Sequence, residues 1–149
     1  MPHFGLMDDE DSFDKPEGAL LRARLHIRGG KRRLRQGKIS AGIVTLYDAL
    51  MFALRWYIAL PGQKEALSVL EEHDLSDEKR IFGKIKSADL FPVDFDYDEF
   101  NALVEMASEE EMPEFDYTGM LSDFEAFMTR LGVMPFDEAQ LPPEDPATF

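Results

Sequence analysis

One long apolar stretch, residues 39–60, constrains the fold of this chain more than any other feature. As a helix it would be about 33 Å long, which is enough to cross a bilayer. Asp48 and Arg55 lie inside it, however, and each charge would cost roughly 2.5–3.5 kcal/mol near the centre of a membrane. We therefore expect no membrane span and predict a central helix that the rest of the fold buries on most sides.

Residues 17–36 are predicted to form a helix that pairs with residues 39–60 in an antiparallel hairpin. Pro16 suits the first turn of a helix, and Gly37 suits its C-terminal cap. Residues 20–28 also alternate between apolar and basic side chains, as a strand would, and this alternative stays open. We favour the helix because apolar residues recur at every seventh position and because Ala, Leu and Arg are good helix formers.

Capping signals predict the later helices. Asp96 suits an N-cap, Glu99 completes a capping box, and Phe95 is placed to pack on Phe100 as a hydrophobic staple. The triplet Phe-Asp-Tyr recurs at residues 115–117, and it predicts the same entry for the next helix, which ends before a glycine.

Together these signals predict an all-α protein, with a single compact domain of about five to six helices around the hairpin. The domain spans residues 15–134, and residues 63–72 and 76–88 supply two short helices. A mobile acidic leader, residues 1–14, precedes it. A Pro-rich acidic tail, residues 135–149, follows it as an extended or mobile arm.

Charge is sorted along the chain. Residues 15–38 hold nine of the sixteen Lys and Arg against one acid, whereas residues 89–149 hold seventeen Asp and Glu against one base. The net charge of −14 works against non-specific binding to nucleic acid and to anionic lipid. We therefore expect the basic segment to dock on the acidic half of its own chain. The alternative is a nucleic-acid-associated protein that uses residues 22–38.

No motif predicts a catalytic residue, a metal or a cofactor. The chain has no Cys, and its three His are scattered. Acids within residues 94–105 follow the spacing of a calcium-binding EF-hand loop, but Glu99 stands where such a loop requires glycine. We expect no calcium site there.

Eight residues are candidates for an interaction surface or a pocket. The basic ones would contact an acidic surface. Those inside the apolar stretch would either pair with a neighbouring helix, for instance Asp48 with an arginine of residues 22–35, or line a ligand pocket. The candidates are Arg28, Arg32, Arg33, Arg35, Asp48, Arg55, Trp56 and Tyr57.

Small residues across the hairpin resemble one tetratricopeptide unit over residues 23–56. Gly30 sits where that family has its helix-A glycine, Gly42 and Ala49 occupy its two small helix-B positions, and Leu46 occupies its large apolar one. The resemblance implies two antiparallel helices in close contact, which an ordinary helical hairpin would also provide. Four other family positions, Trp, Leu, Tyr and Pro, are here His26, Gly29, Arg33 and Leu54.

These features favour a non-enzymatic, cytoplasmic protein-interaction or adaptor module that is able to self-associate. Large apolar residues in acidic company near residues 89–128 predict an apolar groove rimmed by charge. The expected partner is a protein or a second copy of the chain, not a membrane. An enzyme of unrecognised type is the third alternative.

Overall fold

The computed structural model describes residues 16–60 and 95–148, which form an all-α fold. Within these ranges no strand occurs, so the predicted fold class is confirmed. The predicted helices at 63–72 and 76–88 and the leader at 1–14 lie outside the described residues. The helices are α2 (Pro16–Arg35), α3 (Ile39–Ile58), α6 (Tyr97–Glu109) and α7 (Thr118–Leu131), followed by the 3-10 turns η3 (Glu138–Gln140) and η4 (Pro146–Thr148).

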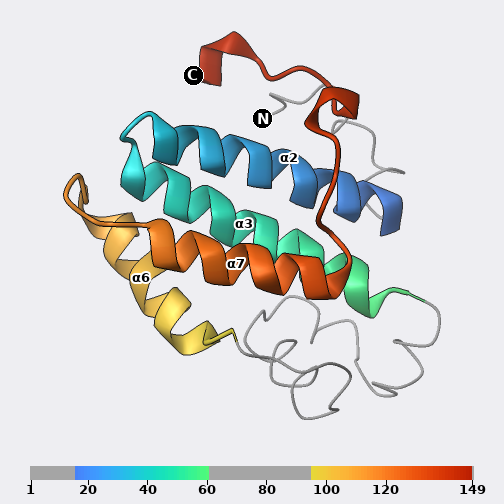
Figure 1. The fold of residues 1–149 in the computed structure, drawn as a ribbon, viewed down its shortest axis with the longest axis horizontal. Coiled ribbons are helices and arrows are strands. Elements are labelled where there is room, and N and C mark those ends of the chain that lie inside the picture. Colours follow the sequence, from blue (N-terminus) through green and yellow to red (C-terminus); the bar gives the residue numbers. More distant parts are fainter. Residues whose placement is uncertain (1–15, 61–94, 149) are drawn as a thin grey trace.

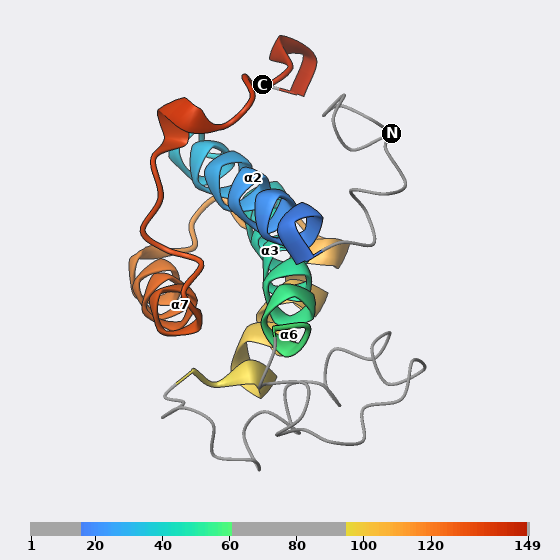
Figure 2. The ribbon, with the colours of Figure 1, turned by 90° about the vertical axis from the view of Figure 1, so that its right-hand side faces the viewer.

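Helix α3 lies at the centre of the fold. It forms the predicted antiparallel hairpin with α2 on one side, and it contacts α6 and α7 on the other (Figure 1). After α7 the chain turns back and crosses to the far side of α2, so that α2 lies between α3 and the C-terminal segment (Figure 2). The acidic tail and the basic helix, which are remote in sequence, are thereby side by side.

Residues 20–28 are helical, and the strand alternative is wrong. Their alternation arises because α2 is covered on two faces. Ile27 packs in the core against α3, whereas Arg28 is buried beneath the C-terminal segment. Helix α2 runs without interruption to Arg35, and Gly37 follows with a φ of 81°, as predicted for its cap.

Two glycines, Gly30 of α2 and Gly42 of α3, allow the two helices of the hairpin to approach closely. A Cβ atom on Gly30 would lie 2.8 Å from the Leu46 side chain and 3.2 Å from the Gly42 carbonyl oxygen. A Cβ on Gly42 would lie 2.8 Å from the Leu34 side chain and 3.0 Å from the Gly30 carbonyl oxygen. The predicted close contact is confirmed, because any larger residue at either position would push the two backbones apart.

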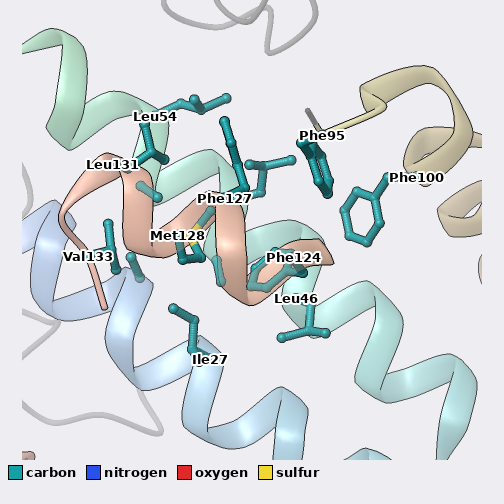
Figure 3. Packing of buried hydrophobic residues seen from close by; sticks show 14 of the residues in the cluster. Ile27, Leu46, Leu54, Phe95, Phe100, Phe124, Phe127, Met128, Leu131 and Val133 are labelled. Atoms are coloured by element: carbon teal, nitrogen blue, oxygen red, sulfur yellow. The ribbon is translucent and has the colours of Figure 1, made fainter. Parts of the chain in front are cut away.

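In the core, four Phe residues of the second half pack with residues of α3: Phe95, Phe100, Phe124 and Phe127 (Figure 3). Phe95 stacks on Phe127 with ring centroids 4.9 Å apart, and Phe100 meets Phe124 at 5.8 Å. Leu46 of α3 is fully buried among them. Stacked and tilted aromatic pairs of this kind fix the orientation of helices as well as burying area.

Helix α3 is the predicted central helix. Half of its most apolar window is buried inside the fold, and by length and composition it would also be able to cross a membrane. The core helix of a soluble protein meets the same criterion. Its buried Ser40 donates a hydrogen bond to the carbonyl of Glu110 at 2.6 Å, which ties the start of α3 to the end of α6.

The two predicted helix entries differ in outcome. Asp96 caps α6 by accepting from the Glu99 amide at 3.0 Å, and the Phe95 and Phe100 ring centroids lie 5.4 Å apart, so the predicted N-cap and hydrophobic staple are confirmed. The predicted copy of it is wrong, because α7 begins only at Thr118 and has no side-chain cap. Three residues after Asp116 stands Gly119, which cannot complete a capping box.

Asp116 makes a local turn instead of capping α7. Its carboxylate accepts from the amide of Thr118 at 3.1 Å, and hydrogen bonds from the Thr118 side chain and backbone lower the pKa of Asp116. Helix α7 ends as predicted at Gly132, which has a φ of 93°.

Candidate interaction surfaces

A groove of about 560 Å³ lies between α6 and α7. Its wall on α6 arises because α6 has two faces. Val104 and Ala107 are buried and do not line the groove, whereas Glu99, Leu103 and Met106, spaced by three or four positions, line it. The apolar lining comes from both helices, the segment between them and the residue pair that precedes α6: Phe95, Phe100, Ala102, Leu103, Met106, Phe115, Gly119 and Met120.

The polar part of the groove lining is wholly acidic. It consists of Asp96, Glu99 and Asp123. Residues 95–125 contain eleven Asp and Glu and no Lys or Arg, so the surroundings of the groove are also negative. Met106 is 48% exposed, which is the largest exposure of any large apolar side chain in the described ranges. This is the kind of groove that the sequence predicted near residues 89–128.

A second polar surface joins α2 to the C-terminal segment. Arg28 donates from Nη2 to the carbonyl oxygen of Pro142 at 2.6 Å, and Arg32 donates from Nε to Oε1 of Glu144 at 3.0 Å. The other carboxylate oxygen of Glu144 lies 3.8 Å from Nε of Arg28. Both arginines are more than nine-tenths buried. Burial holds the side chains of these ion pairs in one arrangement, whereas the side chains of exposed pairs move among several.

Two more basic residues of α2 contact the acidic half. Lys31 pairs with Glu125 of α7 at 2.8 Å. Arg24 donates to the Val133 carbonyl oxygen at 2.9 Å, and its guanidinium lies 5.5 Å from the centre of the Phe136 ring. The expectation that the basic segment docks on its own acidic half is confirmed for these contacts.

The remaining basic candidates lie at the C-terminal end of α2. Arg33 is half-buried. Burial lowers its pKa, the charge of Arg32 lowers it further, and the carboxylate of Glu144 raises it. Arg35 is exposed in the last turn, where a positive charge suits the helix dipole.

Asp48 was predicted to pair with a neighbouring helix, for instance with an arginine of residues 22–35. Within residues 16–60 and 95–148 no ion pair joins it to an arginine of α2. Burial raises the pKa of Asp48, and the charge of His26 partly lowers it. His26 donates from Nδ1 to the Arg22 carbonyl oxygen at 2.8 Å, and its ring lies 5.3 Å from that of Phe52. The charged side chain of α2 that acts on the Asp48 carboxylate is therefore His26, and not the arginine given as an example.

The other three candidates on α3 lie apart from the groove. Trp56 packs on the end of α7, because a Cβ on Gly132 would lie 3.4 Å from its ring. Tyr57 is buried in the core, and burial raises its pKa. Arg55 is half-buried. None of them lines the groove between α6 and α7, and a ligand pocket formed by them with Asp48 stays a prediction.

Sequence reasoning missed Glu144 and Pro142 as specific partners of α2. Their signal was an acid that follows two prolines, Pro142 and Pro143, which hold the backbone extended and keep its carbonyls out of helical hydrogen bonds. Within the described ranges, no three His, Asp or Glu side chains are grouped as metal ligands.

The tetratricopeptide resemblance also stays a prediction. Comparisons of this chain with models of known families, with curated proteins and with solved structures found no match.

Proposed function

We propose that this protein is a non-enzymatic interaction module, and that its groove between α6 and α7 receives one amphipathic helix of a partner protein. The observation that carries the proposal is the combination of an apolar lining, an acidic rim and the exposed Met106. Surface apolar patches enclosed by polar residues mark interaction sites in soluble proteins, and helix-in-groove binding uses this arrangement.

The chemistry of the groove specifies the partner helix. Its apolar residues should recur at i, i+3 or i+4, and i+7, and they should be flanked by Lys or Arg that face Asp96, Glu99 and Asp123. Each apolar side chain that becomes fully buried contributes roughly 1.5–3 kcal/mol, whereas an exposed ion pair contributes about 0–1 kcal/mol. The apolar residues would therefore provide affinity, and the charges would orient the helix and speed its association.

The contacts of α2 support this function over nucleic-acid binding. Arg24, Arg28, Lys31 and Arg32 all contact residues of the chain's own acidic half. A phosphate polymer would have to displace these tethered partners while it approached a molecule of net charge −14.

The test uses a labelled amphipathic peptide of 18 Leu and Lys residues, a length of roughly 27 Å as a helix, with Leu at helical spacing. Fluorescence anisotropy with the full chain should show saturable binding. Met106→Gln should weaken it at least fivefold by removing apolar contact, and Glu99→Gln should weaken it by less. Glu109→Gln is the matched control, because Glu109 is an exposed acid of α6 that does not line the groove.

A scrambled peptide of the same composition separates groove binding from general attraction to an acidic protein. Equal affinity for the ordered and scrambled peptides would refute the proposal. Light scattering provides the second arm, since a dimer that Met106→Gln dissociates would assign the groove to a second copy of the chain instead of a different protein.

A further inference from the structure

We propose that Arg28, Arg32 and Arg33 of α2 form a binding site for a phosphate group, and that the carboxylate of Glu144 occupies this site as an internal ligand. The site is independent of the groove between α6 and α7. It lies on the opposite side of α3, where the C-terminal segment crosses α2 (Figure 2).

The first argument is the construction of the site. Residues 28 and 32 are neighbours on the surface of α2 at a spacing of i and i+4, and residues 29 and 33 form a second such pair beside them. Gly29 forms the floor, because the position of a Cβ there would be 3.0 Å from Nη1 of Arg33 and 3.7 Å from Oε1 of Glu144. A side chain at this position would fill the space that the carboxylate now reaches.

The second argument is the use of donors. One carboxylate lies 3.0 Å from Nε of Arg32 and 3.8 Å from Nε of Arg28. The Arg28 Nε is buried and donates no hydrogen bond to any described residue. Buried guanidinium donors without acceptors are costly, so a ligand with more acceptor oxygens would suit this site better than a carboxylate does.

A phosphate group meets that requirement. It offers three acceptor oxygens and a charge of about −1.5 to −2 at neutral pH, whereas a carboxylate offers two oxygens and a single charge. Arginine forks bind phosphate with paired hydrogen bonds. The crowding of positive charge also favours a dianion, because burial and the neighbouring Arg32 both disfavour the charged form of Arg33.

Because Glu144 occupies the site, an external phosphate has to compete with it for the three arginines. The tail is part of the same chain, so its effective concentration is high and an external phosphate has to displace it. Displacement would also free the carbonyl of Pro142 from Arg28. The C-terminal segment would then detach from α2 when phosphate binds.

The experiment measures phosphate binding to the full chain by calorimetry and compares it with sodium chloride at matched ionic strength. Glu144→Gln should bind inorganic phosphate at least tenfold more tightly than the unaltered chain, because the internal ligand is lost. Glu138→Gln is the matched control: Glu138 is exposed in the same tail and forms no ion pair with α2 among the described contacts. In the Glu144→Gln background, Arg33→Gln should abolish binding. Melting curves verify that each variant is folded.

A second arm identifies the source of the phosphate. A peptide of residues 140–148 with phosphoserine in place of Glu144 is compared with free phosphate and with the same peptide carrying Glu. Stronger binding of the phosphopeptide would assign the site to a phosphorylated segment, and equal binding would assign it to free phosphate. Equal affinity of all variants for phosphate would overturn the proposal, as would binding that survives Arg33→Gln. A random DNA duplex that binds Glu144→Gln more tightly than either phosphate probe would assign the face to nucleic acid instead.

Discussion

Arg28 and Arg32 illustrate how burial decides how much a charged residue contributes to stability. Both are more than nine-tenths buried, and both lie beside Glu144. Removing one partner of a buried pair costs about 3–5 kcal/mol because the other charge is left uncompensated. Arg35, on the same helix, is exposed. An exposed charge contributes about 0–1 kcal/mol to stability. Arg32 and Arg35 therefore differ in their contribution to stability, although they are only three positions apart and look alike in the sequence.

Asp48 gives a prediction about pH. Folding raises the pKa of Asp48, chiefly through burial, so the folded state binds this proton more tightly than the unfolded state. The resulting stabilisation is complete below the ordinary pKa of about 3.9 and is lost as pH rises through the raised pKa. Asp48→Asn should therefore raise the Tm by a few degrees at pH 7, and the difference should shrink towards pH 4.

Melting curves between pH 4 and pH 8 check this, with Glu109→Gln as a control for an exposed acid of α6. A Tm difference for Asp48→Asn that does not change over this range would contradict the assigned burial.

Leu50 gives a prediction about the core. Its side chain is fully buried on α3, the helix that contacts the three others described. Leu50→Ala should lower the free energy of unfolding by about 2–5 kcal/mol, because burial is lost and a cavity remains. Urea denaturation measures this, with Met51→Ala at the half-buried neighbouring position as the control. A loss no larger than that of the control would show that α3 is not the central helix.

At the scale of elements, the hairpin was predictable because its determinants are local. Apolar residues 39–60 define one helix, Gly37 ends the other, and small residues at 30 and 42 mark the contact. Asp96 with Glu99 likewise predicts the start of α6 from four residues of sequence. The copy of this entry at Asp116 failed because a capping box needs its second member, and Gly119 stands there.

The contacts between remote elements were not predictable at the level of residues. Charge sorting predicts that the basic segment meets acids, but seventeen acids offer many pairings, and only the path of the tail selects Glu144. The strand-like alternation of residues 20–28 was also not interpretable from the sequence alone. It indicates a helix only if the C-terminal segment covers the face of α2 that α3 does not, and this is a property of the tertiary fold.

The close contact of the hairpin predicts an asymmetry between neighbouring positions. Gly42→Leu should destabilise the protein by roughly 1–3 kcal/mol more than Ala41→Leu, because overpacking a tight contact costs about that much even when the structure adjusts. Position 42 faces Leu34 and the Gly30 backbone, whereas Ala41 is exposed. Thermal and urea unfolding of the two variants measure the difference, and equal effects would remove the argument for close approach at Gly30.

At the scale of the whole molecule, the sorted charges organise the two halves of the chain around α3. The basic helix lies between α3 and the acidic C-terminal segment (Figure 1). Acidic residues line the groove between α6 and α7. The whole chain carries a net charge of −14. For the proposed function, this net negative charge would attract a basic protein partner and repel a nucleic acid at long range.

The same arrangement predicts how charge reversal acts. Arg32→Glu would place a second carboxylate beside Glu144, so it should lower stability by about 3–5 kcal/mol, whereas Arg35→Glu should cost less than about 1 kcal/mol. Exchanging the pair, with Arg32→Glu and Glu144→Arg together, should recover part of the loss, because the two sites are coupled. Added salt should reduce the loss of stability caused by Arg32→Glu only partly, because buried charges are screened less than exposed ones.

Urea unfolding at low and high salt measures these differences, and a gel-shift titration with a random duplex provides the functional comparison. The unaltered chain should show no binding tighter than about 10⁻⁴ M at 0.15 M salt, the weak end of non-specific affinity. Micromolar duplex binding that Arg32→Glu abolishes while the free energy of unfolding stays unchanged would contradict the internal docking of α2. It would then favour nucleic acid as the partner of the basic helix, because Arg32 would contribute to duplex binding and not to the contact with Glu144.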